Sequence, residues 1–217
     1  MIKNLIFDLD GTLLDTITDI GLAINDALKA SDIPYRYSKE ECRFLIGNGA
    51  DVLMHKALKD LDTAANFLRL KKEYMPRYKE YQNRHTVPFD GMEETLRKLK
   101  NLGISLFVCT NKPDDLAVTI TKNALPSVRF EEVRGLRVGE KPKPNPYIVD
   151  YFVKSHSLKK EETFFVGDSV TDLQTAQNAS LRFGLCLWGY GIYDDFLKGS
   201  ADIVFEKPAD FERILKL

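Results

Sequence analysis

A short apolar run near the N-terminus ends at two aspartates, Asp8 and Asp10, which are separated by one residue. The run, which ends with Phe7, is typical of a buried strand. Because residues i and i+2 of an extended chain point to the same face, both carboxylates project together where the strand stops. Gly11 then allows a tight turn away from the strand. Two carboxylates this close repel each other unless a proton or a cation lies between them, and Mg²⁺ prefers such oxygen ligands.

Two other interpretations of this stretch have to be weighed. For a lone Asp-x-Asp, a strand followed by a polar turn is the favoured explanation. A calcium-binding loop is excluded, since its glycine belongs at the sixth position and follows a helix, whereas Gly11 stands at the fourth position after a strand. The choice between a turn and a cation site therefore depends on whether suitable polar groups follow later strands.

Composition limits the classes of protein that this chain can belong to. It has 217 residues, of which 44% are hydrophobic and 29% charged, as in ordinary globular proteins. A formal net charge of −1 gives no basic surface for nucleic acid or an acidic membrane. No signal peptide is visible, and no apolar run approaches the roughly 18 residues that span a bilayer. Three scattered cysteines favour reduced thiols, so we expect a cytoplasmic protein.

The pattern of apolar residues divides the chain in two. Residues 16–84 have helical periodicity throughout, including a capping-box pair at Ser38 and Glu41. From residue 85 onward, predicted strands alternate with predicted helices. The strands are expected at 104–109, 129–133, 163–166, 183–187 and 203–205, and the helices at 92–101, 144–155, 170–178 and from 208 onward. Such alternation predicts an α/β fold with a parallel, Rossmann-like sheet covered by helices on both faces. We expect a core of residues 1–15 and 85–217, with an all-α cap inserted at 16–84.

Ligands of such sheets bind beyond the carboxyl ends of the strands, and polar groups recur at those places. Thr110 and Asn111 follow one predicted strand and can bind anionic oxygens, although Thr-Asn is also common in loops. Lys141 lies in a proline-stiffened loop, where a solvated basic turn is the alternative. Asp168 and Asp172 follow another strand and can face one cation, although Asp168 could instead cap the next helix.

The combined set has the chemistry that phosphoryl transfer requires: carboxylates for a divalent cation, a hydroxyl for an oxyanion and an amine for charge neutralisation. In this order the groups resemble the four motifs of the haloacid dehalogenase superfamily. The quoted motifs are Asp8-Leu9-Asp10-Gly11-Thr12, Thr110-Asn111, Lys141-Pro142 and Gly167-Asp168-Ser169-Val170-Thr171-Asp172. Within that superfamily, the segments Leu13–Thr16, Ile46–Met54 and Thr110–Lys112 resemble those of phosphoglycolate phosphatases.

The resemblance implies a role for each motif residue. Asp8 would be the nucleophile that forms an aspartyl-phosphate, and Asp10 the general acid and base. The phosphoryl group would be held by Thr110, Asn111 and Lys141. Mg²⁺ would be bound by Asp8, the backbone carbonyl of Asp10, and Asp168, with support from Asp172. The predicted site residues are thus Asp8, Asp10, Thr110, Asn111, Lys141, Asp168 and Asp172.

The expected activity is a Mg²⁺-dependent phosphatase for a small phosphate ester, and 2-phosphoglycolate is the best single guess. Arg43 and the cap loop Gly47-Asn48-Gly49 are the candidate substrate contacts, although Arg43 is equally consistent with a solvated surface position. Inorganic pyrophosphatase and sugar-phosphate phosphatase are the alternatives. A phosphomutase and a non-catalytic binding protein fit the intact motifs less well. The sequence carries no indication of oligomeric state.

Overall fold

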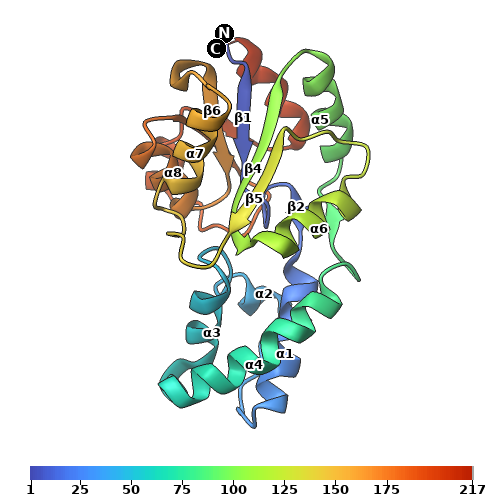
Figure 1. The fold of residues 1–217 in the computed structure, drawn as a ribbon, viewed down its shortest axis with the longest axis vertical. Coiled ribbons are helices and arrows are strands. Elements are labelled where there is room, and N and C mark those ends of the chain that lie inside the picture. Colours follow the sequence, from blue (N-terminus) through green and yellow to red (C-terminus); the bar gives the residue numbers. More distant parts are fainter. Residues whose placement is uncertain (217) are drawn as a thin grey trace.

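A parallel six-stranded sheet forms the centre of one half of the molecule in the computed structural model, which describes residues 1–216 (Figure 1). The strands lie in the order β5-β4-β1-β6-β7-β8, and each neighbouring pair is parallel. Their bounds are β1 Asn4–Phe7, β4 Ser105–Pro113, β5 Glu132–Leu136, β6 Thr163–Gly167, β7 Arg182–Cys186 and β8 Ile203–Phe205. The predicted α/β fold with a parallel sheet is confirmed.

Helices cover both faces of this sheet, and adjacent side chains of β1 pack on opposite faces. Leu5 and Phe7 pack on the face covered by α5 (Met92–Asn101), α6 (Asp114–Ala124) and the 3-10 helix η3 (Pro208–Lys216). Ile6 packs on the other face, covered by α7 (Tyr147–Ser155), α8 (Val170–Asn178) and α9 (Asp195–Gly199). Because both faces are buried, a strand in this position is apolar throughout rather than alternating.

The second half of the molecule is helical and lies at the end opposite the two termini (Figure 1). It contains α1 (Ile17–Ala30), α2 (Lys39–Cys42), α3 (Ala50–Leu58), the 3-10 turn η1 (Lys59–Leu61) and α4 (Ala64–Tyr81). The capping box predicted for Ser38 and Glu41 starts α2. These helices pack on one another through their own apolar cluster. This is the predicted helical insertion, and the boundaries at 15/16 and 84/85 stay a prediction.

Two linkers join the helical half to the sheet, and they pair with each other. β2 (Leu14–Asp15) and β3 (Val87–Pro88) form a short antiparallel ribbon. Beyond it, the buried carboxylate of Asp19 on α1 accepts hydrogen bonds from the backbone N–H groups of His85 and Thr86 and from the Thr86 hydroxyl, at 2.9–3.0 Å. The returning linker is therefore anchored to the first helix of the insertion.

The structure shifts several predicted elements. The strand expected at 129–133 lies at Glu132–Leu136, and the last helix is a 3-10 helix. The helix expected from residue 144 starts only at Tyr147. Pro144 and Pro146 explain this delay, since a residue that precedes proline is disfavoured in the helical conformation. Among the residues that the structure describes, no helix has the length and apolar character to cross a membrane.

Candidate active site

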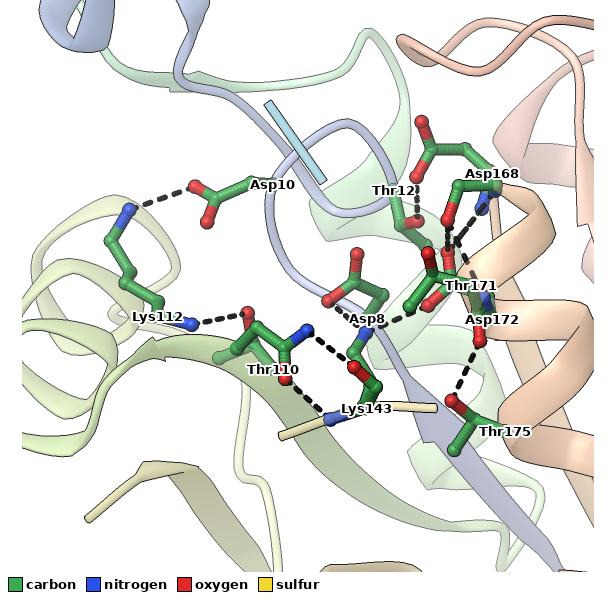
Figure 2. A network of polar contacts seen from close by, with 12 residues as sticks. Asp8, Asp10, Thr12, Thr110, Lys112, Lys143, Asp168, Thr171, Asp172 and Thr175 are labelled. Atoms are coloured by element: carbon green, nitrogen blue, oxygen red, sulfur yellow. Dashed lines mark hydrogen bonds and ion pairs between the residues drawn. The ribbon is translucent and has the colours of Figure 1, made fainter. Parts of the chain in front are cut away.

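The polar groups predicted at separate strand ends meet beside β1. The chain passes from β1 to β4 and β5 on one side, then returns to β6, β7 and β8 on the other. β1 is therefore the point at which the strand order reverses, the place where parallel sheets bind ligands. Figure 2 shows Asp8 from the end of β1, Thr110 from β4, Asp168 from the turn after β6 and Asp172 from the first turn of α8 close together.

Three of the predicted carboxylates form a buried cluster. Oxygens of Asp8, Asp168 and Asp172 all lie within 4.8 Å of one another. The exposed fractions of these residues are 6%, 3% and 0%. Oδ1 of Asp8 forms an ion pair with Lys143 Nζ at 2.7 Å. Three buried carboxylates this close together are a donor set that suits a hard divalent cation such as Mg²⁺.

The cluster raises the pKa values of two of its carboxyl groups, Asp8 and Asp168. Burial, with repulsion from Asp172, raises the pKa of Asp8 to about 7 despite the opposing charge of Lys143. Burial, together with the charges of Asp172 and Asp8, raises the pKa of Asp168 to about 8. Both carboxyls therefore hold protons more tightly than a solvated aspartate does. A bound cation would favour the ionised carboxylates and so oppose the effects of burial and repulsion.

Asp172 already uses both of its oxygens within the protein. Oδ2 accepts hydrogen bonds from the backbone N–H groups of Asp168 and Ser169, at 3.2 and 3.1 Å, and from the Ser169 hydroxyl at 2.6 Å. Oδ1 accepts one from Lys143 Nζ at 2.7 Å. Ser169, rather than Asp168, caps α8, so the capping interpretation of Asp168 is wrong. Asp168 is thus left to face the cluster.

The lysine in this cluster is Lys143, and the structure does not bring the predicted Lys141 to the site. Lys143 is buried, and its Nζ lies 2.7 Å from Asp8 Oδ1 and 2.7 Å from Asp172 Oδ1. Lys141 is exposed. The segment Lys141–Pro146 contains the pattern Lys-Pro-x-Pro twice, two residues apart, so the pattern alone fits either lysine. Two negative charges outweigh the effect of burial and raise the pKa of Lys143, which keeps its charge.

Asn111 holds the Lys143 loop through both ends of its side chain. Its Nδ2 donates to the carbonyl oxygen of Lys143 at 3.1 Å, and its Oδ1 accepts from the N–H of Lys143 at 2.7 Å. The side chain is therefore engaged by protein, which leaves only its backbone for the predicted phosphate contact. Thr110, next to it, is buried and accepts a hydrogen bond from the N–H of Lys112 at 3.3 Å.

The loop after β7, which the sequence analysis did not single out, orients Asp168. The N–H of Tyr190 donates to Asp168 Oδ2 at 2.6 Å, and Thr12 donates its hydroxyl to Oδ1 at 3.1 Å. The Tyr190 hydroxyl also accepts from the N–H groups of Thr16 and Ile17, at 2.7 and 3.0 Å, where the chain enters the helical half. The sequence feature that could have indicated this loop is the run Trp188-Gly189-Tyr190-Gly191, which directly follows a predicted strand.

Gly11 is required by this arrangement. Its φ is +87°, and a Cβ there would lie 2.6 Å from Asp168 Oδ2. A side chain at this position would push the carboxylate out of the cluster.

Asp10 points away from the three carboxylates, toward the helical half. Its Oδ1 accepts from Lys112 Nζ at 2.8 Å (Figure 2). Lys112 also contacts the hydroxyl of Tyr78 on α4. Asp8, Asp10, Thr110 and Lys112 line a cavity of about 40 Å³ between sheet and helices. Other lining residues come from α1, α3, α4 and the loop before α3. Asp10 is thus separated from the carboxylate cluster and faces the cavity.

The candidate substrate contacts of the helical half lie in two different places. Gly47 and Gly49 line the cavity at Asp8, as expected for residues that face the substrate. Asn48 instead accepts a hydrogen bond from the Thr171 hydroxyl of α8 at 2.6 Å. Arg43 is exposed and lies 3.4 Å from the carbonyl oxygen of Gly189. Asn48 and Arg43 line a neighbouring depression. These two side chains hold the helical half against the core rather than reaching the cavity.

Comparison with known proteins agrees with this geometry. The chain is 31% identical to a phosphoglycolate phosphatase of Vibrio parahaemolyticus over 99% of its own length and 96% of that protein. It is also 31% identical to one of Aliivibrio fischeri, over 95% and 93% of the two chains. A crystal structure described as a predicted phosphoglycolate phosphatase from Haemophilus somnus superposes with a TM-score of 0.89 at 31% identity, covering 99% and 98% of the two chains.

The family profile called haloacid dehalogenase-like hydrolase matches residues 5–186, a range that includes all the site residues described above except Tyr190. The arrangement of Asp8, Asp168, Asp172 and Lys143 around β1 and the full-length relatives lead to one conclusion. This chain belongs to the haloacid dehalogenase-like hydrolase family.

Proposed function

We propose that this protein is a Mg²⁺-dependent phosphatase that hydrolyses a small phosphate monoester, with 2-phosphoglycolate as the best candidate substrate. The observation that carries the proposal is the position of Asp8, whose carboxylate lies 2.7 Å from the Lys143 ammonium and within 4.8 Å of carboxylate oxygens of Asp168 and Asp172. The full-length similarity to phosphoglycolate phosphatases supports the choice of substrate.

The reaction would proceed in two displacements. A carboxylate oxygen of Asp8 attacks phosphorus, the bond from phosphorus to the ester oxygen breaks, and Asp10 gives its proton to the departing alkoxide. Asp10 then takes a proton from a water molecule that attacks the aspartyl-phosphate, which releases inorganic phosphate and restores Asp8. Asp10 suits both steps because it faces the cavity rather than the carboxylate cluster.

The remaining polar groups would stabilise the transferring phosphoryl group. Mg²⁺, held by Asp8, Asp168 and the Asp10 carbonyl, would neutralise charge on the phosphoryl oxygens. Lys143 supplies a second positive charge, and Thr110 supplies a hydroxyl. We assign Asp172 to the orientation of Lys143 and of the turn before α8, because both of its oxygens are occupied by those groups.

The size of the cavity favours a short leaving group. A volume of about 40 Å³ is a few times the roughly 10–15 Å³ that one water molecule needs. A leaving group as short as glycolate suits such a space better than a sugar does. This argues for 2-phosphoglycolate over a sugar phosphate, although inorganic pyrophosphate has a leaving group of comparable size.

The test is a panel of phosphate esters, with and without Mg²⁺, for the wild type and Asp8→Asn. We expect metal-dependent turnover with the highest kcat/KM for 2-phosphoglycolate, and no turnover or labelled phosphoenzyme in Asp8→Asn. A labelled phosphoenzyme that persists in this variant would refute the nucleophile assignment. A panel led by pyrophosphate or sugar phosphates would refute the substrate assignment while leaving the phosphatase assignment intact.

A further inference from the structure

Lys112 is a buried cation that the two displacement steps do not use. Its side chain is 2% exposed, and it follows Thr110 and Asn111 at the carboxyl end of β4. An ammonium has three N–H donors. In the part of the chain that the structure describes, two of them have partners, Asp10 Oδ1 and the Tyr78 hydroxyl. One donor is left for a group in the cavity.

The residues that line the cavity around this donor favour a negatively charged partner for it. Most of the side chains that the helical half contributes are apolar or aromatic, including Ile20, Leu53 and Tyr74. Among the described residues that line the cavity, Lys112 is the only positively charged one, and Asp8 and Asp10 are the acidic ones. An anion in this apolar space is costly unless it pairs with a cation. Lys112 is placed to be that cation.

The position of Lys112 relative to Asp10 sets which anion it can reach. If Asp10 protonates the ester oxygen, that oxygen must lie within hydrogen-bonding distance of its carboxyl. Lys112 Nζ is 2.8 Å from Asp10 Oδ1, so it lies beside the atoms that follow the ester oxygen. In a 2-phospho carboxylic acid, the carboxylate carbon is two covalent bonds from this oxygen. Its carboxylate therefore falls next to the third donor of Lys112.

The third donor of Lys112 also favours such a substrate. It has no partner among the described residues, and a substrate carboxylate supplies a partner of opposite charge. A substrate with a neutral tail leaves this buried donor with a weaker partner, which is unfavourable.

We propose that Lys112 binds the carboxylate of the substrate and so makes the site specific for short 2-phospho carboxylic acids. The proposal rests on the phosphatase function proposed above and adds the residue that selects the substrate class. Tyr78 on α4 holds Lys112 from the helical half, so the selecting cation is shared between the two halves of the molecule.

The experiment compares 2-phosphoglycolate with 2-phosphoglycolamide, which has the same shape and a neutral tail. For the wild type we expect kcat/KM to favour the carboxylate by about 30–100-fold, the value of one charge-assisted hydrogen bond. In Lys112→Met, the ratio should fall to about threefold or less. Lys112→Arg keeps the charge and should retain most of the preference. Lys141→Met, a nearby exposed lysine, should keep the wild-type ratio.

The ratio of kcat/KM for the two esters distinguishes substrate recognition by Lys112 from an effect of Lys112 on Asp10. If Lys112→Met lowers kcat/KM for both esters by the same factor, Lys112 only positions Asp10 and the proposal is wrong. A wild type that hydrolyses both esters equally well also overturns it, while the phosphatase function stands. If the wild type hydrolyses neither ester but does hydrolyse other phosphate esters, the substrate assignment fails. If it hydrolyses no phosphate ester, the phosphatase function fails as well.

A second measurement uses only the wild type and so does not depend on the folding of a variant. Glycolate should inhibit more strongly than glycolamide, with an inhibition constant at least about tenfold lower. Equal inhibition by the two compounds would contradict carboxylate binding at Lys112.

Discussion

Lys143 Nζ lies 2.7 Å from Asp8 Oδ1, and the same nitrogen lies 2.7 Å from Asp172 Oδ1. The ion pair joins the loop before α7 to the end of the central strand β1. It is buried from solvent, so removal of the ammonium would leave two uncompensated carboxylates.

We therefore expect Lys143→Met to lower kcat/KM by about 10³-fold or more, because both phosphoryl stabilisation and the balance of charge at Asp8 are lost. Lys141→Met should stay within about threefold of the wild type, since an exposed lysine interacts weakly with the site. Hydrolysis of p-nitrophenyl phosphate with saturating Mg²⁺ measures both variants. A larger loss in Lys141→Met would restore the assignment made from sequence.

The raised pKa values of Asp8 and Asp168, about 7 and about 8, predict how stability depends on pH without metal. In the unfolded chain both groups have the ordinary pKa, near 3.8. Between these values the folded protein binds more protons, so its free energy of unfolding falls as pH rises from about 4 to about 8. Mg²⁺ should reverse this loss, and its stabilising effect should grow with pH.

Thermal unfolding between pH 5 and 8.5, in EDTA and in Mg²⁺, tests this dependence. Asp168→Asn removes one of the two titrating groups and should flatten the decline of Tm in EDTA. A metal-free Tm that rises steadily through this pH window would contradict the prediction.

Asp19 should matter for stability although it lies outside the cavity. Asp19→Ala would leave the N–H groups of His85 and Thr86 without their acceptor, at a cost of about 3 kcal/mol in the free energy of unfolding. Asp26→Ala, in an exposed position on the same helix, should change it by about 0.5 kcal/mol or less. Urea unfolding compares the two variants, and equal effects would show that the anchor is unimportant.

Gly11→Ala should weaken metal binding through Asp168. The new Cβ would lie 2.6 Å from Asp168 Oδ2, in a backbone conformation with φ of +87°. We expect the Mg²⁺ concentration for half-maximal activity to rise by about tenfold or more, as when an orienting group is lost. Gly91→Ala has a similar φ of +73° but no atom within 4 Å of the new Cβ. It should lower stability by about 1 kcal/mol and leave the Mg²⁺ dependence unchanged.

Several features of the fold could be predicted because they depend on local patterns. The apolar run into Asp8 is buried on both faces as β1, and the alternation after residue 85 is the parallel sheet. The bounds predicted for the helix 170–178 and the strand 203–205 coincide with α8 and β8. Element types follow from the periodicity of a few adjacent residues, which requires no knowledge of distant contacts.

The site was predictable only in part, and Lys143 shows why. Lys141-Pro142 and Lys143-Pro144 present the same local pattern, and the choice depends on which amine reaches Asp8 from a loop more than 130 residues away in sequence. Asn111 makes that choice by binding both backbone polar groups of Lys143. Such a pairing between distant loops leaves no periodic signal in either segment.

By itself, the sequence determined the strand that ends at Asp8 and Asp10, the alternation that builds a sheet around it, and the residue types that suit phosphoryl transfer. Tertiary structure decided that Lys143 pairs with Asp8, that the oxygens of Asp172 bind groups of the protein, and that Lys112 lines the cavity. The physical reason is that residue type and spacing define what a group can do chemically. Burial and distance between segments far apart in the chain define which charges meet.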